Sequence, residues 1–381
     1  MKTAPLTEVA TIERRGVDPA SLPSNTRYLG LEHIERGGRI IGSDTVGGAE
    51  LASTKFAFTP DHVLYGKLRP NLGKVTRPTF AGVCSTDILP IRPGPKLDRD
   101  YLAHYLSQPA TIDFAASRTS GANLPRISPT VLGTFEIPLP PLDEQRRIAA
   151  ILDRAVELCA MRRKVTGNLV ALEQANFIET FGDPIRNEMN WPTGSLGQQA
   201  VRITDGEHKT PLRTQSGIPL LSARSVQRGW IDFSATDHIG EDTYETLRRR
   251  IEPQDGDVLI SCSGTIGRVA RVSGAQRFAM VRSVALVRPG ASLSPGFLQQ
   301  LLATDSLNAL MNVRANSSAQ ANLFQNQIRD LPVIVPPIAL QKSFEEQIEA
   351  VTQLRLLSTA ALAKLVELTA SLQSRAFSGQ L

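Results

Sequence analysis

The sequence of 381 residues has few cysteines and few aromatic residues, and it contains no long hydrophobic run. Its three cysteines, Cys84, Cys159 and Cys262, are scattered, so we expect neither a disulfide framework nor a zinc site. The longest apolar run, residues 331–340, contains three prolines and is too short to span a bilayer. The first residues lack the apolar core of a signal peptide. Together these absences predict a cytoplasmic protein.

Catalytic motifs are also missing. No glycine-rich phosphate-binding motif follows a predicted strand, and the Asp/Asn-Pro-Pro-aromatic tetrapeptide of amino-methyltransferases does not occur. A nuclease would need clustered acidic residues and a lysine, and Asp61 and Lys67 match this pattern poorly. The histidines show no metal-ligand spacing; they are His33, His62, His104, His208 and His238. We therefore expect no catalytic centre, no metal site and no cofactor bound by this chain.

The sequence does contain a modest surplus of positive charge. Lysine and arginine number 42 against 37 aspartate and glutamate residues, which gives a formal net charge of +5. The surplus lies in residues 1–142 and 181–340, outside two stretches that we predict to be helical. This distribution is compatible with contact between the two blocks and the phosphates of a nucleic acid.

An internal repeat organises the chain. The segment Pro-Pro-Leu-Asp-Glu-Gln at residues 140–145 returns as Pro-Pro-Ile-Ala-Leu-Gln at residues 336–341, an offset of 336 − 140 = 196. At the same offset, Arg-Pro-Gly at residues 92–94 returns at residues 288–290. Several further matches follow in order at or near this offset, which indicates a duplication.

Each copy of the repeat predicts a long helix with a coiled-coil seam. Apolar residues recur in steps of three and four, with a polar interruption at Arg162 in the first helix and at Ser358 in the second. The common heptad phase favours pairing of the two helices; the alternative is two separate amphipathic helices, each lying on its own domain. The predicted seam contains Ile148, Ile151, Leu158, Leu169, Leu172, Val351, Leu354, Leu365, Leu368 and Leu372.

The helices divide the chain into four predicted parts. Prolines precede each helix, and Gly182-Asp183-Pro184 ends the first one. The blocks before the helices contain short β-rich runs, turn residues and one short helical stretch each, so they predict mixed domains. The fold class is therefore α+β: two mixed α/β domains joined by two long helices. The expected boundaries are residues 1–137 and 183–335 for the domains, and residues 138–182 and 336–381 for the helices.

The loops of both domains are rich in side chains that bond to phosphates and base edges. For any one of these residues a solvated loop side chain is the alternative interpretation, but they recur at equivalent places in the two halves. In the first domain the candidates are Lys67, Arg69, Asn71, Lys74, Arg118, Ser120, Asn123 and Arg126. In the second domain they are His208, Lys209, Ser263, Thr265, Arg268, Arg282, Arg314, Asn316 and Asn322. The densest basic run, residues 248–250, is either a phosphate-binding segment or a solvated helix end.

The repeated helix entrances resemble a known family. Residues 137–148, Ile-Pro-Leu-Pro-Pro-Leu-Asp-Glu-Gln-Arg-Arg-Ile, closely resemble the central region of type I restriction–modification specificity subunits. Residues 376–381 resemble the usual C-terminal ending of that family, and the runs at residues 205–211 and 263–267 resemble parts of its target-recognition domains. The likeness covers essentially the whole chain. The second helix entrance departs from the family pattern, and the first block has no counterpart of the Asp-Gly-x-His run at residues 205–208.

The resemblance implies a pseudo-twofold molecule with two target-recognition domains at opposite ends of an antiparallel coiled coil. Each domain would read one half of a bipartite DNA site, and the helices would act as a ruler between the half-sites. The implied partners are double-stranded DNA, two adenine methyltransferase subunits and a restriction (translocase) subunit, in a system of DNA methylation and phage defence. S-adenosylmethionine and catalysis would belong to the methyltransferase. The rival interpretations are an enzyme with an unrecognised motif, and a scaffold subunit of a related phage-defence complex that binds DNA without sequence preference.

Overall fold

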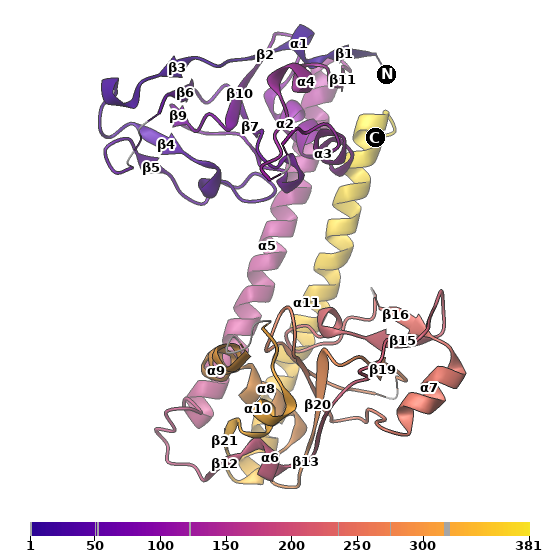
Figure 1. The fold of residues 1–381 in the computed structure, drawn as a ribbon. Helices are drawn as coiled ribbons and strands as arrows, with labels where there is room; N and C mark the ends of the chain where they lie inside the picture. The colour runs from indigo at the N-terminus through magenta and orange to yellow at the C-terminus, as the bar shows by residue number, and fades with distance from the viewer. Residues whose placement is uncertain are drawn as a thin grey trace. The chain divides into compact units, whose positions relative to one another are not determined.

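The computed structural model describes residues 2–49, 51, 53–121, 123–234, 236–274, 276–315 and 321–381. The chain divides into two compact units. Unit 1 contains Met1–Arg163 and Ala361–Leu381, and unit 2 contains Lys164–Ala360 (Figure 1). Among the described residues, no helix is both long enough and apolar enough to cross a membrane.

Two long helices, α5 (Leu142–Phe181) and α11 (Ile338–Ser378), each contribute one segment to unit 1 and one to unit 2. Both helices begin directly after a pair of prolines, which lack the N–H group needed to continue a helix upstream. Both are followed by a glycine in the left-handed conformation, Gly182 with φ +75° and Gly379 with φ +79°. This conformation ends a helix at little cost only when the residue is glycine.

The described residues of unit 1 form three small sheets. A four-stranded sheet has the order β2 (Ala10–Ile12), β10 (Ile88–Pro93), β7 (Val63–Gly66) and β8 (Val75–Thr76). A five-stranded sheet has the order β3 (Gly16–Val17), β6 (Lys55–Phe58), β9 (Gly82–Cys84), β4 (Arg27–Leu29) and β5 (Asp44–Thr45). Strand β1 (Thr3–Pro5) pairs with β11 (Glu136–Pro138), and the short helices are α1 (Leu6–Val9), α2 (Arg99–Ser107), α3 (Pro109–Ala116) and α4 (Pro129–Gly133).

Unit 2 repeats this plan. Its first four-stranded sheet has the order β13 (Ala200–Asp205), β20 (Val284–Pro289), β17 (Val258–Ser261) and β18 (Val269–Arg271), which matches β2-β10-β7-β8 strand for strand. The second has the order β14 (Arg213–Thr214), β16 (Asp237–Ile239), β15 (Ile218–Leu221) and β19 (Ala279–Met280). Strand β12 (Thr193–Ser195) pairs with β21 (Pro332–Ile334), and the short helices are α6 (Leu196–Gln199), α7 (Glu241–Arg248), α8 (Pro295–Ala303), α9 (Asp305–Ala315) and α10 (Gln325–Arg329). The second sheets differ most, since that of unit 1 has five strands and that of unit 2 has four among the described residues; in unit 2, α7 follows β16.

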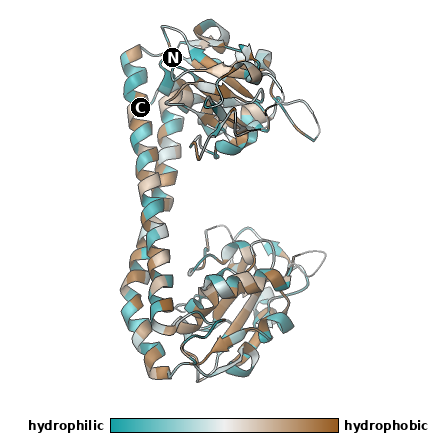
Figure 2. Cartoon of the chain, turned by 90° about the vertical axis from the view of Figure 1, so that its left-hand side faces the viewer, coloured by the Kyte–Doolittle hydropathy of each residue, from teal (hydrophilic) through white to brown (hydrophobic). Residues whose placement is uncertain are grey.

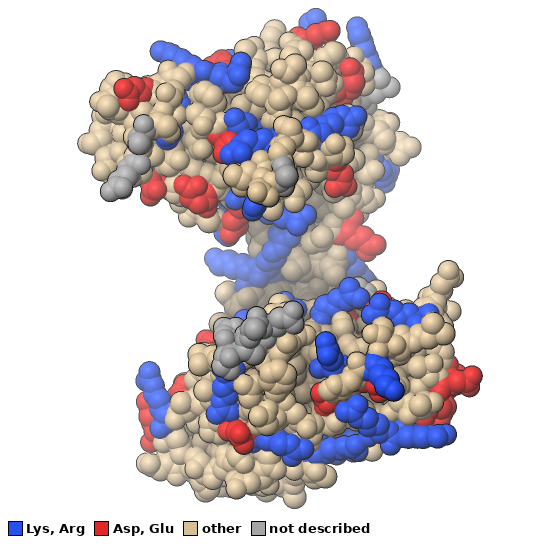
Figure 3. Space-filling model, in the orientation of Figure 1, with Lys and Arg blue, Asp and Glu red and all other residues tan. Residues whose placement is uncertain are grey.

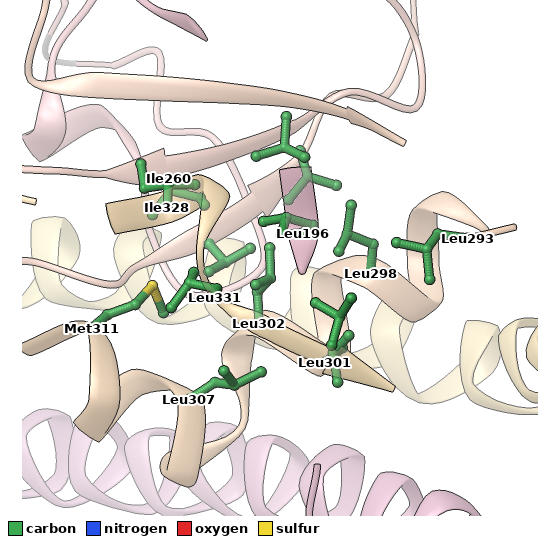
Figure 4. Packing of buried hydrophobic residues seen from close by; sticks show 14 of the residues in the cluster. Leu196, Ile260, Leu293, Leu298, Leu301, Leu302, Leu307, Met311, Ile328 and Leu331 are labelled. Atoms are coloured by element: carbon green, nitrogen blue, oxygen red, sulfur yellow. The ribbon is translucent and has the colours of Figure 1, made fainter. Parts of the chain in front are cut away.

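The central strands β7 and β17 are buried on both faces. Alternate side chains of a strand point to opposite faces, and in β17 Val258 and Ile260 belong to one hydrophobic cluster while Leu259 belongs to another. Strand β7 divides in the same way, with Val63 and Leu64 in different clusters. Figure 4 shows part of the larger cluster of unit 2, where leucines of α8 pack near Ile260. Each unit therefore has a hydrophobic cluster on both faces of its central strand.

A buried glutamine near the start of each long helix makes the same three hydrogen bonds. In unit 1, the Gln145 side-chain oxygen accepts from the Asp98 amide at 2.8 Å, and its nitrogen donates to the carbonyls of Lys96 and Pro140 at 3.0 and 2.9 Å. In unit 2, the Gln341 side-chain oxygen accepts from the Ser294 amide at 2.8 Å, and its nitrogen donates to the carbonyls of Ser292 and Pro336 at 2.9 and 2.8 Å. All four positions in one unit lie 196 residues from their counterparts in the other. The two copies of the repeat therefore share the same hydrogen-bond donors and acceptors at this point.

The two long helices run antiparallel within each unit. In unit 1, the Cys159 sulfur lies 3.5 Å from the Thr369 hydroxyl. In unit 2, the Thr166 and Ser358 hydroxyls are 3.1 Å apart, and Glu173 accepts a hydrogen bond from Arg355 at 2.8 Å. Residue numbers rise along α5 as they fall along α11. The predicted antiparallel pair and the predicted α+β fold class are therefore confirmed.

Six of the ten predicted seam residues are buried or partly buried. Ile148 is buried, and Ile151, Leu169, Val351, Leu365 and Leu372 are partly buried. The other four predicted members are exposed: Leu158, Leu172, Leu354 and Leu368. In each case the next residue faces the partner helix instead, namely Cys159, Glu173, Arg355 and Thr369. At these four positions the contacts between the helices are therefore made by small and polar side chains, and the predicted leucines face outward.

Candidate nucleic-acid interface

In unit 1 two loops meet at the end of β7. The Ile127 amide donates to the Lys67 carbonyl at 3.0 Å, and the Arg69 amide donates to the Pro125 carbonyl at 2.7 Å. A β-bridge joins Leu68 to Arg126. This junction brings together candidates that are far apart in the sequence: Lys67, Arg69, Asn71 and Lys74 from one loop, and Ser120, Asn123 and Arg126 from the other.

Asp87 lies beneath this junction and binds two of its cations. Arg126 donates to both carboxylate oxygens at 2.9 and 3.0 Å, and the Lys67 ammonium lies 3.8 Å away. The hydrogen bond from Arg126 is the main reason why the pKa of Asp87 lies below its ordinary value. Because one carboxylate faces two cations, the group keeps a net positive charge on the surface.

The remaining candidates of unit 1 differ in exposure. Arg69, Asn71, Ser120 and Asn123 are exposed, and Arg69 adopts a left-handed backbone with φ 49°. The Lys74 ammonium instead donates to the Leu31 carbonyl at 2.7 Å, so this side chain is turned into the unit. Arg118 is exposed and stacks 3.5 Å from the centre of the Phe114 ring, as a flat guanidinium group on an aromatic face.

Unit 2 forms the same junction with different side chains. The Leu323 amide donates to the Cys262 carbonyl at 2.8 Å, and a β-bridge joins Ser263 to Asn322. Ser263, Thr265 and Arg268 therefore lie on a loop beside Asn322. Arg268 donates to the Gln227 side chain at 3.1 Å.

The acidic groups of the Asp-Gly-Glu-His run hold it as a turn after β13. The His208 ring lies 2.7 Å from the Asp205 carboxylate, which also binds Arg250 at 3.2 Å. The Lys209 amide donates to the Glu207 carboxylate at 2.9 Å. His208, Lys209 and the nearby Arg282 are exposed, and the Arg282 amide donates to the Glu207 carbonyl at 2.9 Å.

One further candidate of unit 2, Arg314, lies on α9. The Arg314 guanidinium donates to the Gln327 carbonyl at 2.8 Å. Asn316 lies outside the described residues.

The sequence analysis did not single out two exposed arginines that share an acidic partner. Arg213 and Arg224 are exposed and both contact the Asp237 carboxylate, at 3.1 and 3.5 Å. No motif joins these positions: Arg213 lies on β14 and Asp237 on β16, whereas Arg224 lies in the short 3-10 turn after β15. On the face of unit 2 drawn in Figure 3, lysine and arginine side chains spread across the middle of the surface, with few acidic side chains between them.

The chemistry that these surfaces offer is positive charge and hydrogen-bond donation. Burial raises the pKa of the Cys262 thiol to about 12 and raises that of Cys84 as well, so both sulfurs stay protonated at neutral pH. Among the described residues, no group of three or more His, Cys, Asp or Glu side chains is placed to hold a metal ion. The arrangement suits binding of a polyanion.

Residues 1–165 match the family described as the type I restriction modification DNA specificity domain. The chain is 32% identical over 165 residues to the type I restriction enzyme EcoDI specificity subunit of Escherichia coli, a match that covers 43% of this chain and 36% of that protein. It is 23% identical over 330 residues to the EcoKI specificity subunit of Escherichia coli strain K12, covering 80% of this chain and 69% of that one. The match to the EcoDI subunit thus spans about a third of the length of that relative.

Solved structures share the fold of the whole chain. A type I restriction–modification system S subunit from M. genitalium superimposes with a TM-score of 0.61 at 14% identity, covering 99% of this chain and 96% of that one. A chain from a structural study of the assembly and conformational transition of a type I R-M system gives a TM-score of 0.53 at 19% identity, covering 100% and 98%. These likenesses support the two-unit architecture.

Proposed function

We propose that the chain is the DNA-reading subunit of a type I restriction–modification complex. Residues 1–165 match the DNA specificity domain family, and the fold of the whole chain is similar to that of a type I S subunit. Each unit reads one half of a bipartite double-stranded site. The observation that carries this proposal is the loop junction that both units form with different side chains. A repeated scaffold with divergent surface residues is what two readers of different base sequences require.

The charges of the loops favour DNA as the ligand. Arginine and lysine contacts to phosphates supply affinity that does not depend on sequence. Asparagine, serine and arginine side chains at the same junction can bond to base edges, which supplies the discrimination. In unit 1 this role falls to Arg69, Asn71 and Asn123, and in unit 2 to Ser263 and Asn322.

The long helices set the distance between the half-sites and dock the partner subunits. Large apolar side chains are exposed along both helices: Val156, Leu158, Met161, Val165, Leu172, Leu354, Leu357, Val366 and Leu368. Figure 2 shows the hydrophobic residues that recur along these helices. An exposed apolar surface on a helix pair is typical of an interface with another protein. We assign it to two methyltransferase subunits, to which a restriction subunit can join.

The chain contributes recognition and no catalysis of its own. S-adenosylmethionine, the transfer of its methyl group and flipping of the target adenine belong to the methyltransferase partner.

Selection from a random DNA library tests this proposal. The purified chain, with its methyltransferase partner, should retain a bipartite site with a fixed gap as the salt concentration rises, because non-specific binding weakens steeply with salt. A library that shows no base preference would support a scaffold role instead. Turnover of DNA by the chain alone, with magnesium or S-adenosylmethionine, would overturn the non-catalytic assignment.

A matched pair of insertions tests the spacing role. Seven residues added after Arg163 in α5 and seven added after Lys364 in α11 keep the heptad faces and lengthen both helices by about 10 Å. Since one base pair rises about 3.4 Å, the selected gap should grow by about three base pairs. The half-site sequences should stay the same. An unchanged gap would contradict the ruler role.

A further inference from the structure

Unit 2 contains a buried ion pair in the helix seam. The Arg355 side chain on α11 is 2% exposed, and its Nε atom donates to the Glu173 carboxylate on α5 at 2.8 Å. Glu173 is itself 5% exposed. Both charges are removed from water, so their mutual orientation is strongly directional.

The same guanidinium also binds the backbone of the recognition domain. Its Nη1 atom donates to the Arg228 carbonyl at 3.0 Å, and its Nη2 atom donates to the Gly229 carbonyl at 3.4 Å. Gly229 has φ +83°, and a Cβ atom added there would lie 2.4 Å from Nη2 of Arg355. The turn at residues 228–229 is thus built closely around the arginine.

The turn at residues 228–229 is hydrogen-bonded to the loop that contains the candidate DNA contact Arg268. The Gly229 amide donates to the Val269 carbonyl at 2.7 Å, directly after Arg268. The neighbouring Gln227 accepts a hydrogen bond from the Arg268 guanidinium at 3.1 Å. A continuous set of hydrogen bonds therefore runs from the helix seam through the turn to Arg268.

At the equivalent positions, unit 1 has neither the buried ion pair nor an arginine bound to the turn. The offset of 196 relates Arg355 to Cys159 and Glu173 to Thr369, and these two meet in a contact of 3.5 Å between small side chains. The counterpart of Gly229 is Gly37, where an added Cβ would meet nothing within 4 Å. The two recognition domains are therefore attached to the helices in different ways.

We propose that Arg355 is the positioning residue for the DNA-contact loop of unit 2. It fixes the turn at residues 228–229, which fixes Arg268 and the loop at residues 261–268. Reading of the half-site by unit 2 depends on this side chain, while unit 1 reads its half-site without such a residue. The inference rests on the proposed function.

Two variants remove the positioning without leaving a lone buried charge. Arg355→Lys keeps the pair with Glu173 but loses the planar set of donors that reaches both carbonyls. The double variant Glu173→Met/Arg355→Met removes both charges and keeps side-chain volume, a replacement that folded proteins commonly tolerate. The matched control in unit 1 is Cys159→Ala/Thr369→Val.

Selection from the random DNA library, with the full chain and its methyltransferase partner, should then show a loss of base preference in one half-site and not in the other. Both Arg355 variants should lose base preference at least tenfold in the half-site of unit 2, which is identified as the one that Ser263→Ala alters. Preference in the other half-site should be unchanged, and the control should keep both. Equal loss in both half-sites, or full preference in the double variant, would overturn the proposal.

Hydrogen exchange provides a readout that needs no DNA. The amides of Gly229 and Arg268 should exchange at least tenfold faster in both Arg355 variants, at an unchanged melting temperature. Unchanged protection of these amides would also refute the positioning role. If wild-type protein selects no bipartite site while exchange responds as expected, the proposed function fails and the structural coupling stands.

Discussion

The two units use one contact identically and another quite differently. Gln145 and Gln341 make the same three hydrogen bonds at the start of α5 and α11. In the seam, by contrast, the Cys159–Thr369 contact of unit 1 corresponds to the buried Glu173–Arg355 ion pair of unit 2. The duplication kept the geometry of the helix entrance and allowed the contacts that orient each recognition domain to diverge.

A second contrast concerns the acidic residues with which each long helix binds its domain. In unit 1, Asp153 of α5 binds Arg77 at 2.6 Å and His104 at 2.8 Å. The residue at the equivalent position in unit 2, Glu349, is exposed. There Glu345 accepts hydrogen bonds from the Gly296 and Phe297 amides at the start of α8 instead. Charge holds both domains on the helices, but it does so through unrelated residues.

The largest expected effect is the loss of Glu173. Glu173→Ala leaves Arg355 as a buried unpaired charge, which should lower the free energy of unfolding of unit 2 by about 3–5 kcal/mol. Thr369→Ala, at the equivalent position of unit 1, should cost no more than about 1 kcal/mol. Denaturant unfolding of both variants measures the difference. Similar losses in the two variants would show that the seam is energetically symmetric.

The helix entrances should respond alike. Gln145→Ala and Gln341→Ala each remove three hydrogen bonds from buried groups, so each should lower the free energy of unfolding by about 3 kcal/mol. Exposed Gln353 on α11, changed to Ala, is the control. A clear difference between the two entrances would contradict the view that they have kept the same role.

The smallest expected effect is a loss of stability of unit 1 at acidic pH. Burial alone would raise the pKa of Asp153, but hydrogen bonds from His104 and Arg77 outweigh it and hold the pKa well below the ordinary value of 3.8. A carboxylate with a lowered pKa stabilises the fold above its unfolded pKa, and this contribution is lost as the pH falls below that value. Unit 1 should therefore lose stability on acidification from about pH 5 to about pH 3. The side chain is 38% exposed, so solvent weakens the effect.

Asp153→Asn should flatten this acid dependence, and Glu349→Gln in unit 2 should leave it unchanged. Unfolding measured across the same pH range compares the three proteins. An acid dependence that persists in Asp153→Asn would assign it to other carboxylates.

The architecture was predictable because its signals are long or repeated. The offset of 196, the prolines before each helix and the Gly182-Asp183-Pro184 run after the first one predicted the pair of helices. The phase of the seam was not predictable, since counting apolar residues cannot anticipate Glu173 and Arg355 at buried positions. The candidate loops were found by composition, yet composition did not reveal that Lys74 turns inward or that Asp87 joins Lys67 to Arg126. Such contacts depend on residues brought together by the sheets.

Unit 1 is formed by two segments that lie far apart in the sequence, and this arrangement affects the order in which the protein folds during synthesis. Residues 361–381 belong to unit 1, where Ala376 is fully buried and the Phe377 ring lies 5.1 Å from that of Tyr101. Unit 2 is encoded between the two pieces of unit 1. Of the two units, the one whose synthesis starts earlier is therefore the one whose core closes later, after contacts between distant segments have formed. Until then, the apolar surface awaiting Phe377 remains open to chaperones and to other nascent chains.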